Sequence, residues 1–286
     1  MKILVCGRNG QVAQALQQAL AGLGELHLLG RDQLDLAQPE AMREPLRQLA
    51  PDLIINAAAH TAVDQAESEA PLAYAINAEG PRVLAEEAAR LGTPLIHYST
   101  DYVFDGNKTT PYVEDDPVHP LGVYGQSKLA GEQAIAAVGA QHLILRTSWV
   151  YSLHGRNFLL TMQRLLQERP QLKVVDDQIG APTWAGTIAA STRALIERWQ
   201  AGQAGAWGTY HLTAQGKTSW FGFAQAIAEQ LKARGLPCAE LLPIPSSEYP
   251  TPARRPLNSR LDCSRLAREW QVSQPHWQQA LIDCLK

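Results

Sequence analysis

The chain has 286 residues, of which 45% are hydrophobic and 19% charged, and its formal net charge is -3. This is the composition of a globular protein, and it excludes a disordered chain or a coiled coil. The charge balance offers no basic surface for nucleic acid, and no apolar run approaches the roughly 18 to 20 residues that a membrane span needs. Neither nucleic acid nor a membrane is therefore expected as a partner.

The N-terminus and the cysteines predict the cellular compartment. Only Ile3 to Gly7 form an apolar run before Arg8, which is too short for a secretory signal. The four cysteines are widely spaced and include no C-x-x-C pair. We therefore expect a reducing, cytoplasmic setting.

In the first half of the chain, short apolar runs alternate with helical patterns. Strands are predicted at 3–6, 26–29, 53–56, 95–98 and 143–145, and helices at 11–20, 40–49, 72–90 and 129–137. Continuous Ile, Leu and Val strands separated by crossover helices predict a parallel sheet with helices on both faces. The expected fold is α/β, a Rossmann-like doubly wound sheet that binds ligands at the carboxyl ends of its strands.

Beyond about residue 150 the pattern loosens, and prolines separate helices near 157–167, 187–199 and 221–233. We interpret residues 151–286 as a smaller C-terminal substrate-binding lobe, parts of which return to the domain formed by residues 1–150. The Pro-rich segment 246–257 is expected to enter the cleft between the two.

Glycines directly follow the first strand and open the first helix. Such glycines let the backbone turn sharply and approach a pyrophosphate, whose charge the helix N-terminal N–H groups stabilise. The spacing is G-x-x-G-x-x-A, and a glycine pair also occurs in ordinary strand-to-helix turns. Its place after an N-terminal strand favours a dinucleotide site, which makes residues 1–150 an NAD(P)-binding domain. Its predicted cofactor ligands are Gly7, Asn9, Gly10, Gln11 and Val12.

Charged residues follow the second strand. Arg31, joined by Arg8, could neutralise a 2'-phosphate, which favours NADPH. Alternatively these arginines are surface charges and Asp32 binds the ribose, which would suit NADH. Asp35 and Leu36 are expected beside the adenine.

Small residues follow the third strand. The run from Ala57 to Ala59, continued by His60 and Thr61, would let a flat cofactor lie against the backbone, although tight helix packing explains it equally well. His60 is interpreted as a hydrogen-bonding residue rather than a base, because no carboxylate partner is evident. Ala59, His60 and Thr61 are therefore candidate cofactor ligands.

Proton-transfer chemistry is predicted at the fourth strand and the helix after it. Tyr124 and Lys128 have the i, i+4 spacing that places two side chains on one helix face. The strand 95–98 leads directly to Thr100, which places a hydroxyl at the carboxyl edge of the sheet. A neighbouring ammonium favours phenolate, so the pKa of Tyr124 is expected below the usual value of about 10. Thr100, Tyr124 and Lys128 are the predicted catalytic residues.

With these motifs the sequence resembles the extended short-chain dehydrogenase/reductase superfamily, whose signature is Ser/Thr, Tyr and Lys in Y-x-x-x-K spacing. Within it, the sequence resembles the dTDP-4-dehydrorhamnose reductase family over nearly the whole chain. Ala13 departs from the family pattern, which usually has Gly there. The resemblance is carried by residues 7–12, 56–64, 98–106, 123–132, 146–151, 177–183 and 249–256.

The resemblance implies reduction of the C4 ketone of dTDP-4-dehydro-L-rhamnose, a step of dTDP-rhamnose and cell-surface polysaccharide biosynthesis, by NADPH or NADH. Tyr124 would donate the proton, Thr100 would hold the carbonyl oxygen, and Lys128 would grip the nicotinamide ribose. Tyr98 matches a position that lines the cofactor, while Asp101 and Trp149 match positions that meet the sugar. Trp149 could alternatively be a core residue.

Arginines in and after the Pro-rich segment are candidates for the substrate diphosphate, with Arg255 assigned to it and Arg254 and Arg260 nearby. A solvated basic loop is the alternative.

Two other functions stay open: a non-catalytic NADP-binding regulatory subunit, and a nucleotide-sugar epimerase or dehydratase in which Asp101 acts as an additional acid or base. Catalysis is expected to need no metal, and a homodimer is left open.

Overall fold

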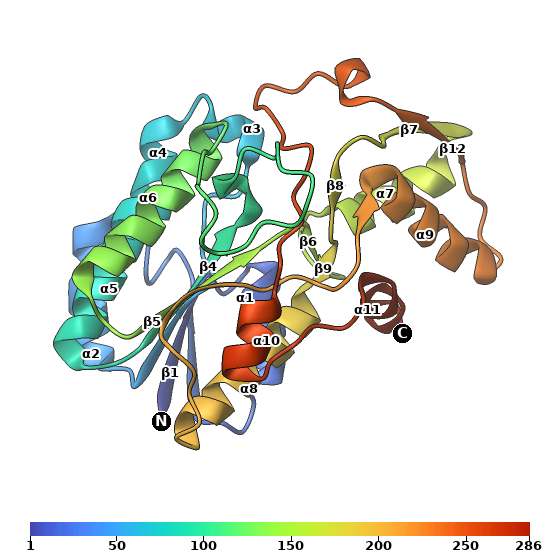
Figure 1. Cartoon of the computed structure of the whole chain (residues 1–286). Helices are drawn as coiled ribbons and strands as arrows, with labels where there is room; N and C mark the ends of the chain where they lie inside the picture. The colour runs from blue at the N-terminus through green and yellow to red at the C-terminus, as the bar shows by residue number, and fades with distance from the viewer.

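A six-stranded parallel sheet forms the centre of the computed structural model, which describes residues 1–286 (Figure 1). The strand order is β10-β5-β4-β3-β1-β2, so the direction of winding changes at β1. Ligands bind at such a switch point, outside the carboxyl ends of the strands. The strands are β1 (Lys2–Cys6), β2 (Glu25–Leu29), β3 (Leu53–Asn56), β4 (Leu95–Thr100), β5 (His142–Thr147) and β10 (Gly208–His211).

Helices cover both faces of this sheet, so the predicted doubly wound fold is confirmed. One face carries α1 (Gln11–Ala19), α8 (Ala185–Gln200) and α10 (Ser264–Trp270). The other carries α2 (Arg43–Leu49), preceded by the short helix η1 (Pro39–Met42), together with α5 (Gly80–Leu91) and α6 (Val123–Val138).

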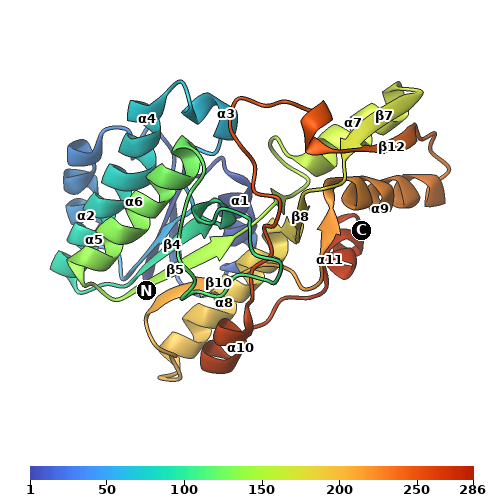
Figure 2. The ribbon, with the colours of Figure 1, turned by 45° about the horizontal axis from the view of Figure 1, so that its top comes forward.

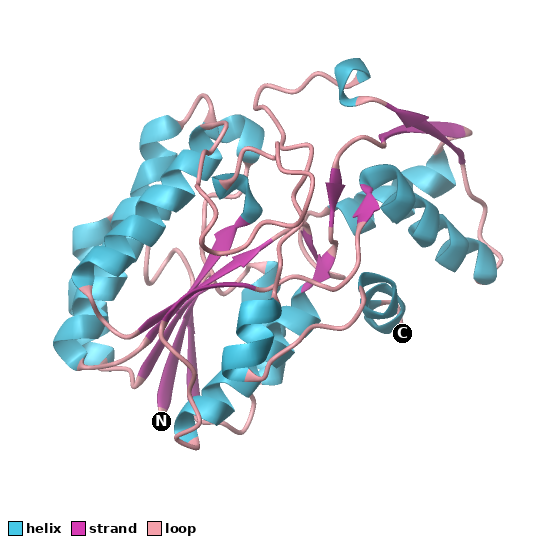
Figure 3. Cartoon of the chain, viewed as in Figure 1, coloured by secondary structure: helices cyan, strands magenta, loops and turns pink.

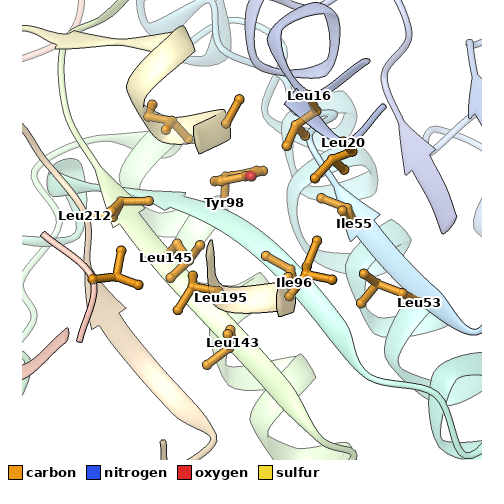
Figure 4. Close-up of a cluster of buried hydrophobic side chains, with 14 of the residues drawn as sticks. Leu16, Leu20, Leu53, Ile55, Ile96, Tyr98, Leu143, Leu145, Leu195 and Leu212 are labelled. Carbon is orange, nitrogen blue, oxygen red and sulfur yellow. The ribbon is translucent and has the colours of Figure 1, made fainter. Parts of the chain in front are cut away.

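Two hydrophobic cores hold the helices on the sheet. Alternate strand residues point to opposite faces, so Val5 and Ile55 pack with α1 and α8, whereas Leu4 and Ile54 pack with α2 and α5. Figure 4 shows the first core, where Leu16, Leu195 and their neighbours meet Ile96 of β4. The inner strands β3 and β4 are buried on both faces, which explains their largely apolar sequences.

The predicted helix 72–90 is interrupted rather than continuous. It consists of α4 (Ala70–Tyr74), the π-helical turn η2 (Ala75–Glu79) and α5, after the short helix α3 (Val63–Ala66). Pro81 lacks the N–H that would continue the α-helical ladder, which favours the wider turn. A Cβ at Gly131 of α6 would collide with the Asn77 carbonyl of this turn, so only glycine permits the close approach.

A second lobe of helices and short strands lies beside the sheet domain (Figure 3). Phe223 and Trp277 belong to its own hydrophobic core. Its helices are α7 (Phe158–Glu168), α9 (Trp220–Ala233) and α11 (Trp277–Cys284). Three short strand pairs complete it: β6 (Val150–Tyr151) with β9 (Thr183–Trp184), β7 (Gln171–Val175) with β12 (Glu240–Ile244), and β8 (Ile179–Gly180) with β11 (Thr218–Ser219).

The chain passes more than once between the two regions. Strand β10 and helices α8 and α10 lie beyond residue 150 yet belong to the sheet domain, while α11 returns to the second lobe. After β12 and the short helix η4 (Ser246–Glu248), the chain passes α3 and descends to α10 (Figure 2). No helix in the structure is both long and apolar enough to cross a bilayer.

Candidate active site

A cavity of about 490 Å³ opens at the carboxyl ends of the strands. It is lined by loops that follow β1, β2 and β3, by the end of β4, and by α6. The lining residues are Gly7, Arg8, Asn9, Gly10, Gln11, Val12, Gly30, Arg31, Ala57, Ala58, Ala59, Thr61, Tyr98, Ser99, Tyr124, Lys128, Thr147, Val150, Gly155 and Arg156.

The glycine loop has the backbone that a dinucleotide requires. Gly7 has φ +90°, and a Cβ there would lie 3.0 Å from the backbone of Ala58, so a side chain is excluded by strain and by space. Gly10 is the N-cap of α1 and supplies no side-chain cap, so the first N–H groups of the helix stay available to an anion. The loop therefore fits a pyrophosphate.

Gln11 also ties this loop to the second lobe. Its Oε1 accepts hydrogen bonds from Ser152 Oγ at 3.0 Å and from Asn157 Nδ2 at 2.8 Å. Asn157 in turn caps α7. A residue expected to touch the cofactor thus also fixes the loop that carries Gly155 and Arg156.

Arginines stand at the outer rim of the cavity beside β2. Arg8 pairs with Asp32 at 3.0 Å and donates to Gln33 at 2.9 Å, while Arg31 lies 3.5 Å from Asp35 and its side chain is 69% exposed. Both guanidinium groups can therefore reach an added phosphate by exchanging exposed partners.

The two residues expected beside the adenine are placed differently from the rest. Neither Asp35 nor Leu36 lines the cavity. Asp35 accepts the N–H of Ala37 at 3.0 Å, and Leu36 is buried in the core against Gly80. Their contact with the cofactor stays a prediction.

The small-residue loop after β3 is held from behind by the π-helical turn. Asn77 accepts the N–H of His60 at 2.8 Å, donates to the His60 carbonyl at 3.1 Å and donates to Ser127 of α6 at 3.0 Å. His60 Nε2 lies 3.5 Å from a Glu69 carboxylate oxygen, so the expectation that His60 has no carboxylate partner is wrong. Glu69 is the N-cap of α4, and only the fold of the chain between the two residues brings its carboxylate to His60.

The three predicted catalytic residues meet at the end of β4. Tyr124 and Lys128 are buried on one face of α6, and Thr100 ends the strand opposite. The pKa of Tyr124 is raised to about 12, mainly by burial, although a hydrogen bond with Thr100 opposes the shift. The expected lowering of this pKa is therefore not found, because burial disfavours the charged phenolate. The phenol keeps its proton, as an acid must.

The side chain of Lys128 contacts two residues of strand β4. Its Nζ donates to the Tyr98 carbonyl at 2.7 Å and lies 3.1 Å from Nε2 of His97. Burial lowers its pKa to about 8, and the charge of Glu132 opposes that shift. Because this pKa is close to physiological pH, the Lys128 ammonium can give up and regain a proton there.

Tyr98 and Asp101 border the same centre. The phenol of Tyr98 turns into the core, 2.6 Å from Thr192 Oγ1, while its residue lines the cavity. Asp101 accepts from Thr100 Oγ1 at 3.0 Å, and burial raises its pKa to about 6 against hydrogen bonds from Ser259 and Thr100. Asp101 is thus a buried carboxyl next to the hydroxyls of Thr100 and Tyr124.

Trp149 lies in an aromatic stack between the domains. Its ring is parallel to that of Trp220, with centroids 3.6 Å apart, and a Cβ at Gly180 would collide with it. Its φ of +49° is a left-handed conformation that non-glycine residues seldom adopt. Strain of this kind often marks functional positions. Its contact with the sugar stays a prediction.

The arginines of the Pro-rich segment differ in their partners. Arg255 bonds to Asp64 of α3 at 2.8 Å, and the same carboxylate accepts the N–H of Ala253 at 3.1 Å. Arg260 donates to Asn258, and Arg254 is exposed. Asp64 thus holds the segment on the sheet domain.

Other residues of the cavity were not found from the sequence. Arg156 and Thr147 line it, Trp220 stacks on Trp149, and His97 contacts Lys128. The one local signal was the position of Thr147 and His97 near strand ends. Arg156 and Trp220 lie in the second lobe, where nothing in the local pattern indicates the cavity.

The groups that line the cavity fit a dinucleotide, and the structure contains no cluster of metal ligands. The glycine backbone, the free helix N-terminus and the rim arginines suit two phosphates and a third at the rim. No group of three or more His, Cys, Asp and Glu side chains is placed to hold a metal ion. That catalysis needs no metal stays a prediction.

Comparisons with known proteins agree on one family. The family model described as the RmlD substrate binding domain matches residues 1–286. A dTDP-4-dehydrorhamnose reductase of Burkholderia thailandensis is 47% identical over 293 residues, covering 100% of this chain and 98% of the relative.

Solved structures give the same result. A dTDP-4-dehydrorhamnose reductase of Clostridium acetobutylicum superposes with a TM-score of 0.91 at 36% identity, covering 100% of this chain and 98% of that one. The enzyme of that name from Bacillus anthracis, solved in complex with NADP, has a TM-score of 0.90 at 34% identity, covering 99% and 98%.

Proposed function

The chain belongs to the dTDP-4-dehydrorhamnose reductase family, and we propose that it reduces the C4 ketone of dTDP-4-dehydro-L-rhamnose to dTDP-L-rhamnose with NADPH. The observation that carries this proposal is that Tyr124 and Lys128 line the same cavity as the glycine loop after β1, with Thr100 beside Tyr124 at the end of β4. The product belongs to dTDP-rhamnose and polysaccharide biosynthesis.

The cofactor would be held from two sides. Gly7, Gly10 and the N-terminus of α1 would bind the pyrophosphate, and Arg31 with Arg8 would bind the 2'-phosphate. Lys128 would hold the nicotinamide ribose. When bound, NADPH supplies the hydride that C4 receives.

Tyr124 would supply the proton to the carbonyl oxygen. Its raised pKa keeps the phenol protonated before reaction. Thr100 would turn its one hydroxyl proton from Asp101 to the same carbonyl oxygen. Lys128, with a pKa near neutrality, would return a proton to the phenolate that Tyr124 leaves.

The second lobe would hold the rest of the substrate. Trp149, beside the strained turn after β5, offers an apolar face to the sugar, and Asp101 offers a buried carboxyl. Arg255 is buried enough to bind a diphosphate strongly once it exchanges Asp64 for the ligand.

The rival functions differ in what they do to the cofactor. A regulatory subunit would have no use for three buried proton-transfer residues, and an epimerase or dehydratase would regenerate its cofactor. Asp101 is the feature that favours the second rival, because burial raises its pKa toward the range of a useful acid.

Absorbance of the reduced cofactor tests the proposal. Purified protein is mixed with NADPH or NADH and freshly made dTDP-4-dehydro-L-rhamnose, and the control omits the sugar. Loss of one reduced cofactor per sugar is expected, faster at low concentrations of NADPH than of NADH. Cofactor that binds without being consumed would refute the reductase.

We further propose a cytoplasmic site of action, supported by four free cysteines. A homodimer stays a prediction, which light scattering on the purified chain would test. Dialysis against EDTA before the assay would test metal independence.

A further inference from the structure

Three buried side chains, Lys128 of α6, His97 of β4 and Asn56 of β3, form a line of hydrogen bonds. Lys128 Nζ lies 3.1 Å from Nε2 of His97, and Nδ1 of the same ring lies 3.0 Å from Nδ2 of Asn56. His97 and Asn56 are 0% exposed. Because no water reaches them, each donor must face an acceptor of the protein.

The orientation of Asn56 is fixed at the far end of this line. Its Oδ1 accepts the N–H of Ala58 at 3.1 Å, in the loop that lines the cavity. A flipped amide would point its NH₂ at that N–H, so Nδ2 must face the imidazole. Asn56 therefore donates to Nδ1 of His97.

This fixes where His97 carries its proton. The ring is neutral, because burial and the charge of Lys128, with His142 of β5 adding to them, hold its pKa well below the usual value. A neutral imidazole has one N–H, and since Nδ1 is the acceptor, that N–H is on Nε2. Lys128 is thus faced by a donor.

A donor opposite Nζ favours the amine over the ammonium. As an amine, Lys128 donates one N–H to the Tyr98 carbonyl, accepts the Nε2 proton with its lone pair and keeps one N–H for the cavity. As an ammonium it would present an N–H to an N–H. The charge of Glu132 acts in the opposite direction, although Arg146 pairs with that carboxylate at 2.7 Å.

We propose that Asn56 and His97 form a positioning pair that sets the proton affinity of Lys128 by presenting it with an N–H rather than a lone pair. Neither His97 nor Asn56 lines the cavity, and their effect on proton transfer would pass through Lys128. The pair thereby keeps Lys128 able to give up a proton near neutral pH. This deepens the proposed function, on which the kinetic part of its test rests.

Nitrogen-15 NMR of imidazole rings tests the pair in the cofactor-free wild-type protein, without any turnover. His97 is identified as the signal that disappears in His97→Gln. Protonation at Nε2 is expected. Protonation at Nδ1 would overturn the inference whatever the enzyme's activity, so a failure here is distinct from a failure of the proposed function.

The substitution Asn56→Asp should reverse the donor and acceptor roles along these hydrogen bonds with little change in side-chain shape. A carboxylate can accept both the Ala58 N–H and an Nδ1 proton, so the His97 proton should move to Nδ1 and Nε2 should accept from the ammonium. The fall in kcat/KM at high pH, the basic limb of the pH profile, should move about one pH unit higher. That shift corresponds to a tenfold gain in the proton affinity of Lys128. An unmoved limb with an unmoved proton would contradict the pair.

Two further variants distinguish an effect passed through His97 from a direct electrostatic effect of the new carboxylate on Lys128. In a His97→Leu background, Asn56→Asp should no longer shift the limb, because the path through the ring is gone. A shift that persists there would show a direct field effect of the new carboxylate and would overturn the relay through His97. His142→Gln is the matched control: that ring bonds to the Ala140 carbonyl at 2.8 Å and should leave the limb unmoved.

Discussion

The proposed cofactor side and the proposed sugar side of the site are built in different ways. On the cofactor side, backbone geometry and strand ends create the site: Gly7, the loop 57–61 and the end of β4 each act within a few residues of one another. On the sugar side, pairs of distant side chains create it. Trp149 stacks on Trp220, and Arg255 reaches Asp64 across 191 residues.

This difference separates chemistry from binding. The proposed proton-transfer residues are buried in the sheet domain, whereas Arg255 is held by an exchangeable contact with the half-exposed Asp64. Changes on the sheet side should therefore lower turnover, and changes on the lobe side should mainly weaken the substrate's binding.

Tyr124→Phe should have the largest effect. Without the phenol proton, kcat is expected to fall by about 10²- to 10⁴-fold, while the dissociation constant for NADPH stays nearly unchanged. Steady-state rates and a fluorescence titration of the cofactor measure the two. Turnover close to that of the wild type would mean that Tyr124 is not the proton donor, and would contradict the assignment of the proton transfer to the sheet domain.

Asp101→Asn tests the border between the two sides through stability. Burial raises the pKa of Asp101 from 3.8 to about 6, so the folded state binds more protons than the unfolded state in that window. Its contribution to stability is therefore present at low pH and lost as pH rises through about 6.

Replacing the carboxyl by an amide should recover up to about 3 kcal/mol at pH 7. Urea unfolding of both proteins at pH 4 and pH 7 measures the difference, which should grow with pH. A difference that is the same at both values would mean that Asp101 is not shifted.

Arg255→Ala probes the lobe side. Loss of a charge-assisted contact to the diphosphate should raise KM for the sugar nucleotide about 30-fold, or ~2 kcal/mol, and leave kcat nearly unchanged. Arg254→Ala is the matched control, because that side chain is exposed. Equal effects of the two would mean a general loss of positive charge rather than a specific contact.

Arg31→Ala should have the smallest effect. Its guanidinium is 69% exposed, so only about 1 kcal/mol of NADPH binding is expected to be lost, roughly a fivefold rise in KM. The KM for NADH, which lacks the 2'-phosphate, should not change. A similar rise for both cofactors would make Arg31 a surface charge.

The sequence predicted the sheet side well because its elements leave local patterns. Apolar runs marked the strands of the central sheet that lie within residues 1–150, and the i, i+4 spacing placed Tyr124 and Lys128 on one helix. The π-helical turn at 75–79 was missed, because its cause is a single Pro81 inside an otherwise regular helical pattern.

On the sugar side, the residues alone indicated only the Pro-rich segment and its arginines, and the roles of Asp101 and Trp149 came from the family resemblance. Nothing within a few residues of Trp220 shows that its ring stacks on Trp149, and nothing near Arg255 shows that Asp64 is its partner. The hydrogen-bond line through His97 was also invisible, since it joins β3, β4 and α6 in three dimensions.

Transfer of a label tests the reductase most directly. NADPH deuterated at the transferable C4 position of its nicotinamide is incubated with the protein and dTDP-4-dehydro-L-rhamnose, and the product is examined by NMR and mass spectrometry. We expect one deuterium at C4 of the rhamnosyl group for each cofactor oxidised. An unlabelled product, or a changed sugar with the reduced cofactor intact, would contradict the account.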